Sequence, residues 1–212
     1  MADFIRDVVR QPAVVAGNSI GAVTVLSAAY AAPELIRGIV LLNAAGRFDA
    51  DAAPPPTPPA ETGLQAFWRR CVSAAIFYST KYRIAPILKT VYVDDSKVDA
   101  ELVQSIYQPA CDDNALEAFY KISGSGGRSK QSLNTLLNGA RAAKLPLLLL
   151  WGLADPWMKP DKADRIVELY PGATLVPLAA GSHCPHDDCP EAVNVALLDW
   201  VAALPACATA AK

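Results

Sequence analysis

The chain has 212 residues, of which 52% are hydrophobic and 19% are charged, so it can fill a core and is not globally disordered. Its 19 basic and 21 acidic residues nearly balance, which argues against a nucleic-acid-binding protein. The length favours one domain with an insertion.

No apolar segment reaches the roughly 18 residues that a membrane-spanning helix needs. The longest candidate, residues 145–153, is interrupted by Pro146 and Gly152. Charged residues within the first seven positions do not fit a secretory signal peptide. The five cysteines are scattered, and no pair forms a CxxC motif, which favours a reducing compartment over a disulfide framework.

The first 45 residues follow a strand–turn–helix–strand pattern, preceded by an amphipathic helical stripe at residues 4–9. Residues 13–16 and 38–42 are short apolar runs, which are typical of strands buried on both faces. Residues 22–32 have helical composition and end before Pro33. This order within about 30 residues predicts a βαβ unit with parallel strands.

Residues 46–140 contain no convincing pair of strands and predict an inserted helical region. The region opens with a proline-rich segment, residues 49–63, which we interpret as a loop with polyproline character. Five helices are expected in this region, at residues 64–78, 84–93, 99–107, 115–122 and 132–140. Helices inserted into an α/β sheet commonly form a lid over its carboxyl edge, where ligands bind.

Residues 141–212 return to the α/β pattern. Strands are expected at residues 145–151 and 174–178, and helices at residues 162–170 and 190–203. The chain is therefore expected to form an α/β fold with a partial parallel sheet of about four strands. Residues 1–45 would form the first part of its core, residues 46–140 a helical lid, and residues 141–212 the second part of the core.

The turn after the first expected strand, residues 17–21, reads Gly-Asn-Ser-Ile-Gly and is a G-x-S-x-G motif between a strand and a helix. Such a turn is sharp and strained, and it lifts the serine hydroxyl above the sheet. Glycines two residues to either side are expected to give this backbone room. Ser19 is therefore the candidate nucleophile, and the N–H of Ile20 the candidate oxyanion donor. The alternative is a tight turn whose serine only caps the helix.

A serine hydroxyl is a poor nucleophile and needs a base, usually an oriented histidine. Both histidines of the chain, His183 and His186, follow the last expected strand. Asp155 follows the third strand, and the order Ser19, Asp155, His183 is that of α/β-hydrolases. The alternative for Asp155 is a turn or helix-capping residue, and the alternative for His186 is a solvated surface residue.

The segment at residues 183–189 also gathers His, Cys and Asp side chains, and all three types are zinc ligands. However, adjacent residues cannot all converge on one ion, and the sequence offers no second cluster of ligands. We therefore expect neither a metal nor another cofactor.

Taken together, these motifs resemble the α/β-hydrolase superfamily, in particular its plant, algal and cyanobacterial branch related to pheophytinase and chlorophyll dephytylase. The resemblance covers nearly the whole chain and is strongest at residues 16–21, 40–46, 91–95, 151–157 and 183–187. It implies the α/β-hydrolase fold with Ser19 as nucleophile, Asp155 as acid and His183 as base. His186 belongs to the same motif and would support its loop, or replace His183 as base.

The resemblance also implies a serine hydrolase that cleaves carboxylic esters of a hydrophobic substrate, such as a chlorophyll-type phytyl ester, in the chloroplast. The expected partner is then a small hydrophobic ester, with no nucleic acid and no transmembrane segment, and peripheral membrane contact stays open. The apolar and aromatic side chains of the expected lid fit this substrate, although they fit packing of the lid equally well: Phe67, Trp68, Ile76, Phe77, Tyr78, Tyr82 and Tyr92.

Three features depart from the branch. Ala22 stands where a second glycine is usual, and Ser182 is inserted between Gly181 and His183, which would shift the base by one residue. Family members also have about 80 residues before the nucleophile, with strands and a second oxyanion donor, so we expect an N-terminally incomplete chain. The alternative function is a catalytically dead fragment or a non-catalytic binding remnant, and a weaker one is a transferase or thioesterase using the same triad.

Overall fold

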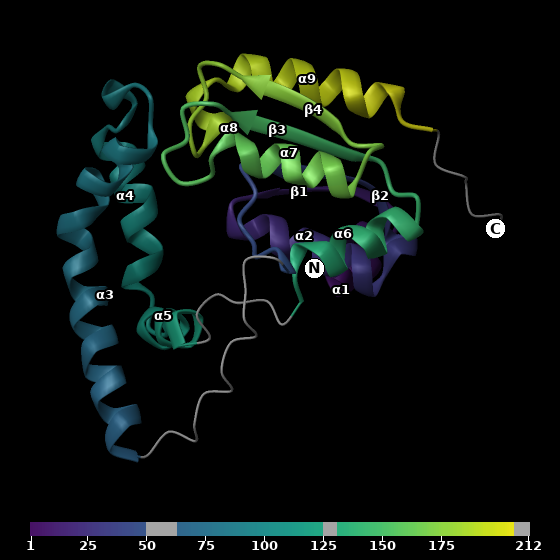
Figure 1. The fold of residues 1–212 in the computed structure, drawn as a ribbon. Coiled ribbons are helices and arrows are strands. Elements are labelled where there is room, and N and C mark those ends of the chain that lie inside the picture. The colour runs from purple at the N-terminus through teal and green to yellow at the C-terminus, as the bar shows by residue number, and fades with distance from the viewer. Residues whose placement is uncertain (50–62, 125–130, 206–212) are drawn as a thin grey trace. The chain divides into compact units, whose positions relative to one another are not determined.

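A computed structural model describes residues 1–49, 63–124 and 131–205 of the chain (Figure 1). The chain forms two compact units. One, the core unit, consists of Met1–Asp49 and Ser129–Lys212, and the other, the helical unit, consists of Ala50–Arg128. Most of the expected proline-rich loop lies outside the described residues.

The core unit is built on a parallel sheet of four strands in the order β1-β2-β3-β4, which confirms the expected parallel α/β sheet. The strands are β1 (Ala13–Asn18), β2 (Ile36–Leu42), β3 (Leu147–Gly152) and β4 (Thr174–Leu178). Every residue of β3 is buried, as its continuous apolar sequence predicts for a central strand covered on both faces.

Strand register brings the carboxyl ends of three strands to one level. Asn18 pairs with Leu42, and Leu42 pairs with Leu150. Residues that directly follow β1, β2 and β3 therefore meet at one edge of the sheet, where ligands of open α/β sheets bind.

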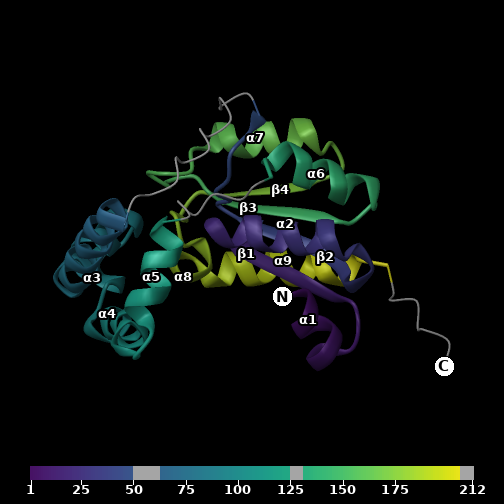
Figure 2. The same ribbon diagram turned by 90° about the horizontal axis from the view of Figure 1, so that it is seen from below.

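Helices cover both faces of this sheet (Figures 1 and 2). Helices α2 (Ile20–Ala31), α6 (Leu133–Ala142) and α7 (Pro160–Leu169) pack on one face, and α9 (Pro190–Ala203) packs on the other. Alternate residues of β2 supply the two cores: Ile39 and Leu41 face the three helices, whereas Val40 and Leu42 face α9.

The ends of several elements differ from the sequence expectation by a few residues. Strand β3 begins at Leu147, not at Leu145, because the Leu145 N–H bonds to the Ala140 carbonyl and closes helix α6. The expected N-terminal helix is present as α1 (Ala2–Phe4), which continues into a π-helical turn at Ile5–Val9.

The helical unit contains α3 (Gly63–Val91), α4 (Ala100–Tyr107) and α5 (Ala115–Gly124). The expectation of separate helices at residues 64–78 and 84–93 was wrong, because α3 runs through both. No glycine or proline lies between those segments, and the hydroxyls of Ser79 and Thr80 bond to the Ile76 carbonyl within the helix.

Helices α3 and α5 are held together by aromatic and charged contacts. The Phe77 and Phe119 rings are 5.5 Å apart between centroids, and Arg70 pairs with Glu117 at 2.6 Å. Within the described ranges, no helix combines the length and apolar character needed to cross a membrane.

Candidate active site

Ser19 lies between β1 and α2 with φ 52° and ψ −121°, a conformation that non-glycine residues rarely adopt. Three backbone hydrogen bonds of about 3.0 Å hold it there: the Ser19 N–H donates to the Leu42 carbonyl, and the Ser19 carbonyl accepts from the N–H groups of Ala22 and Ala45. These contacts with the end of β2 and the residues after it hold the strained backbone of Ser19 in place, as is found at other functional turns. The Ser19 side chain makes no capping hydrogen bond to α2, which argues against the capping interpretation.

Gly17 and Gly21 flank this turn but differ in what they contribute. A Cβ added at Gly17 would lie 2.4 Å from the Gly21 carbonyl oxygen, so only glycine fits where the strand meets the helix. A Cβ added at Gly21 would meet no heavy atom within 4 Å. The expectation that both glycines provide room was therefore wrong for Gly21, because its side-chain position opens into free space.

The Ile20 N–H is the first amide of α2, so the helix itself offers it no acceptor. The partial positive charge of the helix N-terminus adds to this N–H and favours an anion beside it. The Ile20 side chain is 54% exposed, in line with an open turn. The oxyanion role of Ile20 stays a prediction.

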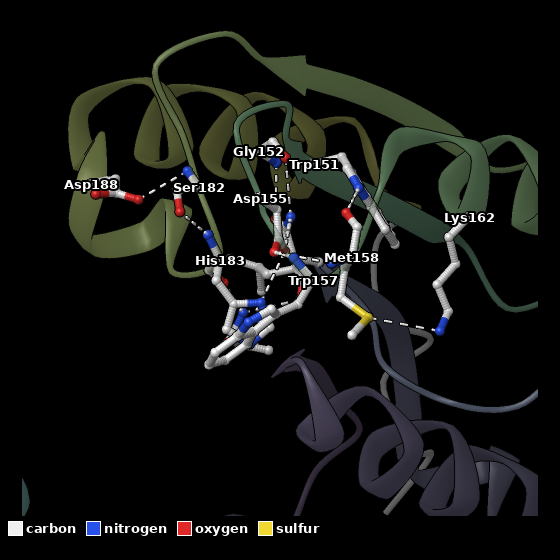
Figure 3. Close-up of polar contacts among 12 residues, drawn as sticks. Trp151, Gly152, Asp155, Trp157, Met158, Lys162, Ser182, His183 and Asp188 are labelled. Atoms are coloured by element: carbon white, nitrogen blue, oxygen red, sulfur yellow. Dashed lines mark hydrogen bonds and ion pairs between the residues drawn. The ribbon is translucent and has the colours of Figure 1, made fainter. Parts of the chain in front are cut away.

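Asp155 is buried and accepts four N–H donors, which satisfy both carboxylate oxygens. Its Oδ1 accepts the backbone N–H groups of Trp157 at 2.7 Å and Met158 at 3.0 Å. Its Oδ2 lies 2.7 Å from Asn43 Nδ2. The same oxygen lies 2.9 Å from Nδ1 of His183, which Figure 3 shows beside Asp155. The carboxylate therefore closes the turn after β3 and also contacts a candidate base.

Burial opposes a charge on Asp155 and by itself would raise the pKa of its carboxyl group. The hydrogen bonds from His183 and from the Met158 and Trp157 amides outweigh this effect and hold the pKa of Asp155 below its ordinary value. At neutral pH, Asp155 is accordingly an anion that can hold a protonated imidazole.

We expect Asp155→Asn to lower the free energy of unfolding by about 1–3 kcal/mol at pH 7, the range for a lost buried hydrogen-bond partner. Because the folded pKa is depressed, the contribution of the carboxylate is fully present above the unfolded pKa of about 3.9 and is lost as the pH falls through the folded pKa. Urea unfolding of both proteins from pH 7 to pH 3 should show a difference that shrinks at the acid end.

The control for this measurement is Asp199→Asn, which removes one carboxylate from an exposed position of α9 and corrects for the change in net charge. A difference between Asp155→Asn and the parent protein that stays constant over the whole pH range would show that the fold does not stabilise the charged form of Asp155.

His183 is 6% exposed, and contacts with Asn18, Ser182 and Trp157 fix its position. Its carbonyl accepts the Asn18 side-chain amide at 2.8 Å, and its N–H donates to Ser182 Oγ at 2.6 Å. The Trp157 ring packs edge-on to the imidazole at 4.7 Å between centroids. The imidazole is thereby held with Nδ1 against Asp155 (Figure 3).

Ser182, which the family resemblance would make an extra residue, leaves His183 in contact with Asp155. The Ser182 N–H donates to Asp188 Oδ2 at 2.9 Å, which anchors the loop from the far side. Gly152 lets the loop come close to β3, since a Cβ there would lie 2.2 Å from the Ser182 carbonyl oxygen. The loop therefore lies close to the end of β3, where His183 reaches Asp155.

The structure separates the two histidines. His186 lies in the short helix α8 (Pro185–Asp188), where it is exposed and lines a groove with Asn194 of α9. Within the part of the chain that the structure describes, Ser19 Oγ and His183 share no hydrogen bond, and the two segments are joined through Asn18, next to Ser19. Catalytic hydrogen bonds of this kind often form only in the complex with substrate.

Sequence reasoning missed two asparagines that build this edge of the sheet. Asn18 donates to the carbonyls of His183 and Leu42 at 2.8 and 3.2 Å. Asn43 contacts Asp155 from the end of β2. The sequence did contain one sign of their role, because each asparagine is a polar residue at the carboxyl end of an apolar strand.

A sequence profile of the alpha/beta hydrolase family matches residues 1–196 of the chain. The chain is 29% identical over 211 residues to chloroplastic pheophytinase of Arabidopsis thaliana. The match covers 93% of this chain and 43% of pheophytinase, so the chain spans less than half the length of that relative.

The fold is similar to solved hydrolase structures. A meta-cleavage product hydrolase from Pseudomonas fluorescens superposes with a TM-score of 0.69 at 19% identity, over 93% of this chain and 68% of that one. A thermophilic esterase from Thermogutta terrifontis gives a TM-score of 0.65 at 18% identity, over 92% and 66% of the two chains. Together with the family match, these similarities confirm the α/β-hydrolase fold.

Proposed function

Because the chain belongs to the alpha/beta hydrolase family, we propose that it is a serine hydrolase that cleaves carboxylic esters. Ser19 is the nucleophile, Asp155 the acid and His183 the base. The proposal is supported chiefly by the buried 2.9 Å contact between His183 Nδ1 and Asp155 Oδ2. This pair lies at the sheet edge where β1 ends in the strained turn of Ser19.

In this proposal, the contact with Asp155 leaves Nε2 as the imidazole nitrogen that acts as base. Since Asp155 accepts the Nδ1–H, the lone pair of the neutral ring is on Nε2, which takes the hydroxyl proton of Ser19. Ser19 Oγ attacks the ester carbonyl, and the Ile20 N–H stabilises the oxyanion. His183 then passes the proton to the leaving alkoxide, and a water molecule, deprotonated by the same base, hydrolyses the acyl-enzyme.

The proposed substrate is hydrophobic. The helical unit contains a cavity of about 530 Å³ whose lining is rich in aromatic side chains, among them Phe77, Tyr78, Tyr82 and Tyr107. Large apolar side chains are also exposed on α3, where Trp68 is 61% and Tyr82 74% exposed. The similarity to pheophytinase supports a phytyl ester of a chlorophyll-type pigment as the substrate, and its chloroplastic name supports a chloroplast location.

The alternative is a protein that retains the fold without activity, which the missing hydrogen bond between Ser19 and His183 in the described residues would favour. A serine-directed fluorophosphonate separates the two functions, because only an activated serine reacts with it.

The substrate class is tested with nitrophenyl esters whose acyl chains grow from two to twelve carbons, alongside a pigment phytyl ester. Each buried methylene contributes about 0.8 kcal/mol, so burial of about two of the methylenes that separate octanoate from acetate already raises kcat/KM by about tenfold, and burial of more raises it further. Hydrolysis that is equal for all chain lengths would contradict a hydrophobic substrate. No hydrolysis of any ester, together with no fluorophosphonate labelling, would contradict the enzyme proposal.

A further inference from the structure

Asn43, the residue after β2, is fully buried and uses both atoms of its side-chain amide at the carboxyl edge of the sheet. Its Nδ2 donates to Asp155 Oδ2 at 2.7 Å and to the Gly152 carbonyl at 3.1 Å. Its Oδ1 accepts the Gly152 N–H at 2.9 Å. One side chain therefore ties the end of β2 to the end of β3 and to the carboxylate that follows.

The backbone at this position restricts which residues can stand there. Asn43 has φ 40°, in the left-handed region, where asparagine and glycine are far better tolerated than other residues. Aspartate shares this tolerance and the shape of asparagine, but it would bring a second carboxylate. Glycine fits the backbone but has no amide.

The amide of Asn43 and the imidazole of His183 approach the same carboxylate oxygen, Asp155 Oδ2. The other oxygen is occupied by the backbone amides of Trp157 and Met158. Rotation of the carboxylate would break contacts at both oxygens, so the four donors together define one orientation. The donors come from the segments after β2, β3 and β4, and Asn43 is the donor from the segment after β2.

We propose that Asn43 is a positioning residue, whose neutral amide holds the Asp155 carboxylate with Oδ2 directed at His183 Nδ1. The inference rests on the proposed function, since the pair that Asn43 orients is the acid and base of that reaction. An amide suits this role because it donates a hydrogen bond without adding charge. A carboxylate in its place would compete with Asp155, since two adjacent carboxylates cannot both ionise freely.

The test uses Asn43→Asp and Asn43→Gly in the 212-residue chain, with Asn138→Asp on the exposed face of α6 as the matched control. NMR spectroscopy of the two histidine rings follows the hydrogen-bonded Nδ1–H proton of His183 and the chemical shifts of its ring. These readouts need no catalytic activity, and a second set in which His186 is replaced by Gln assigns the signals.

We expect Asn43→Asp to shift or broaden the Nδ1–H signal of His183, because a second carboxyl group replaces the amide donor beside Asp155 and competes with Asp155 for a proton. We expect Asn43→Gly to broaden or abolish the Nδ1–H signal, because the carboxylate loses its fixed orientation. In ester hydrolysis, Asn43→Gly should lower kcat by about 10–100-fold with KM within about twofold, since Asn43 orients the acid and not the substrate. Asn138→Asp should leave all three quantities as in the parent protein.

An Nδ1–H signal of His183 that is unchanged in both folded Asn43 variants would overturn the inference. A change of the same size in the Nδ1–H signal of Asn138→Asp would also overturn the inference, because it would show a general effect of charge. If Asn43→Gly does not fold, Asn43→Asp still decides, because it keeps the shape of the side chain. If the parent chain hydrolyses no ester but the NMR effects are present, the proposed function fails while the positioning role of Asn43 stands.

Discussion

Replacing Ser19 by alanine is expected to abolish covalent labelling by a fluorophosphonate and to lower ester hydrolysis by about 10³-fold or more. The reason is the geometry of the turn: the strained backbone at φ 52° is held by hydrogen bonds to the end of β2 and to the residues after it, and the side chain does not cap the helix. Labelling followed by intact-mass spectrometry, together with nitrophenyl ester turnover, measures both effects.

The matched control for this prediction is Ser27→Ala, which removes a hydroxyl from the same helix away from the turn. It should keep the labelling and turnover of the parent chain. Labelling that persists in Ser19→Ala would exclude Ser19 as the nucleophile, and peptide mapping would then locate the serine that reacts.

His183→Ala is expected to lower ester hydrolysis by about 10³-fold or more, whereas His186→Ala should have a much smaller effect. His183 is buried and contacts Asp155 at 2.9 Å, while His186 is exposed on α8. Turnover of both variants is compared at equal helical content by circular dichroism, so that loss of folding is not read as loss of chemistry.

A larger loss in His186→Ala than in His183→Ala would show that His186, and not His183, is the base. Equal losses in two folded variants would contradict the assignment of a single imidazole as base. If His186 were the base, the contact between His183 and Asp155 would be structural, because the ring that it orients would not be the catalytic one.

Local patterns in the sequence predicted most of the core. Apolar runs at residues 13–16 and 38–42 became β1 and β2. Strand β2 is buried on both faces, as its apolar sequence predicts. The expectation of burial on both faces was wrong for β1, which ends the strand order and leaves Ala16 exposed. The G-x-S-x-G spacing placed Ser19 at a turn between a strand and a helix, and the structure has that turn with a positive φ. These features depend on residues close together in the chain, which is why the sequence alone could predict them.

Features that depend on packing could not be read in the same way. Helix α3 continues through the expected break before Ile84, because nothing in that segment interrupts backbone hydrogen bonding and Pro86 is accommodated inside the helix. Glycine is required at position 17 but not at position 21, because backbone atoms lie next to the Cβ position of Gly17 and no heavy atom lies near that of Gly21. Only the folded turn places those backbone atoms.

The sequence by itself determined the strand order along the chain, the strained turn at Ser19 and the short list of acids and bases that follow the strands. Only the tertiary structure decided which of them meet. His183 reaches Asp155 across 28 positions of the chain, and Asn43 reaches it across 112. Both contacts depend on the register of β2 and β3 and on the path of the loop after β4, and hydrogen bonding requires this geometry to within a few tenths of an ångström. Spacing along the chain contains no such information, so a polar residue such as Asn43 becomes visible as part of the site only once the strands have paired.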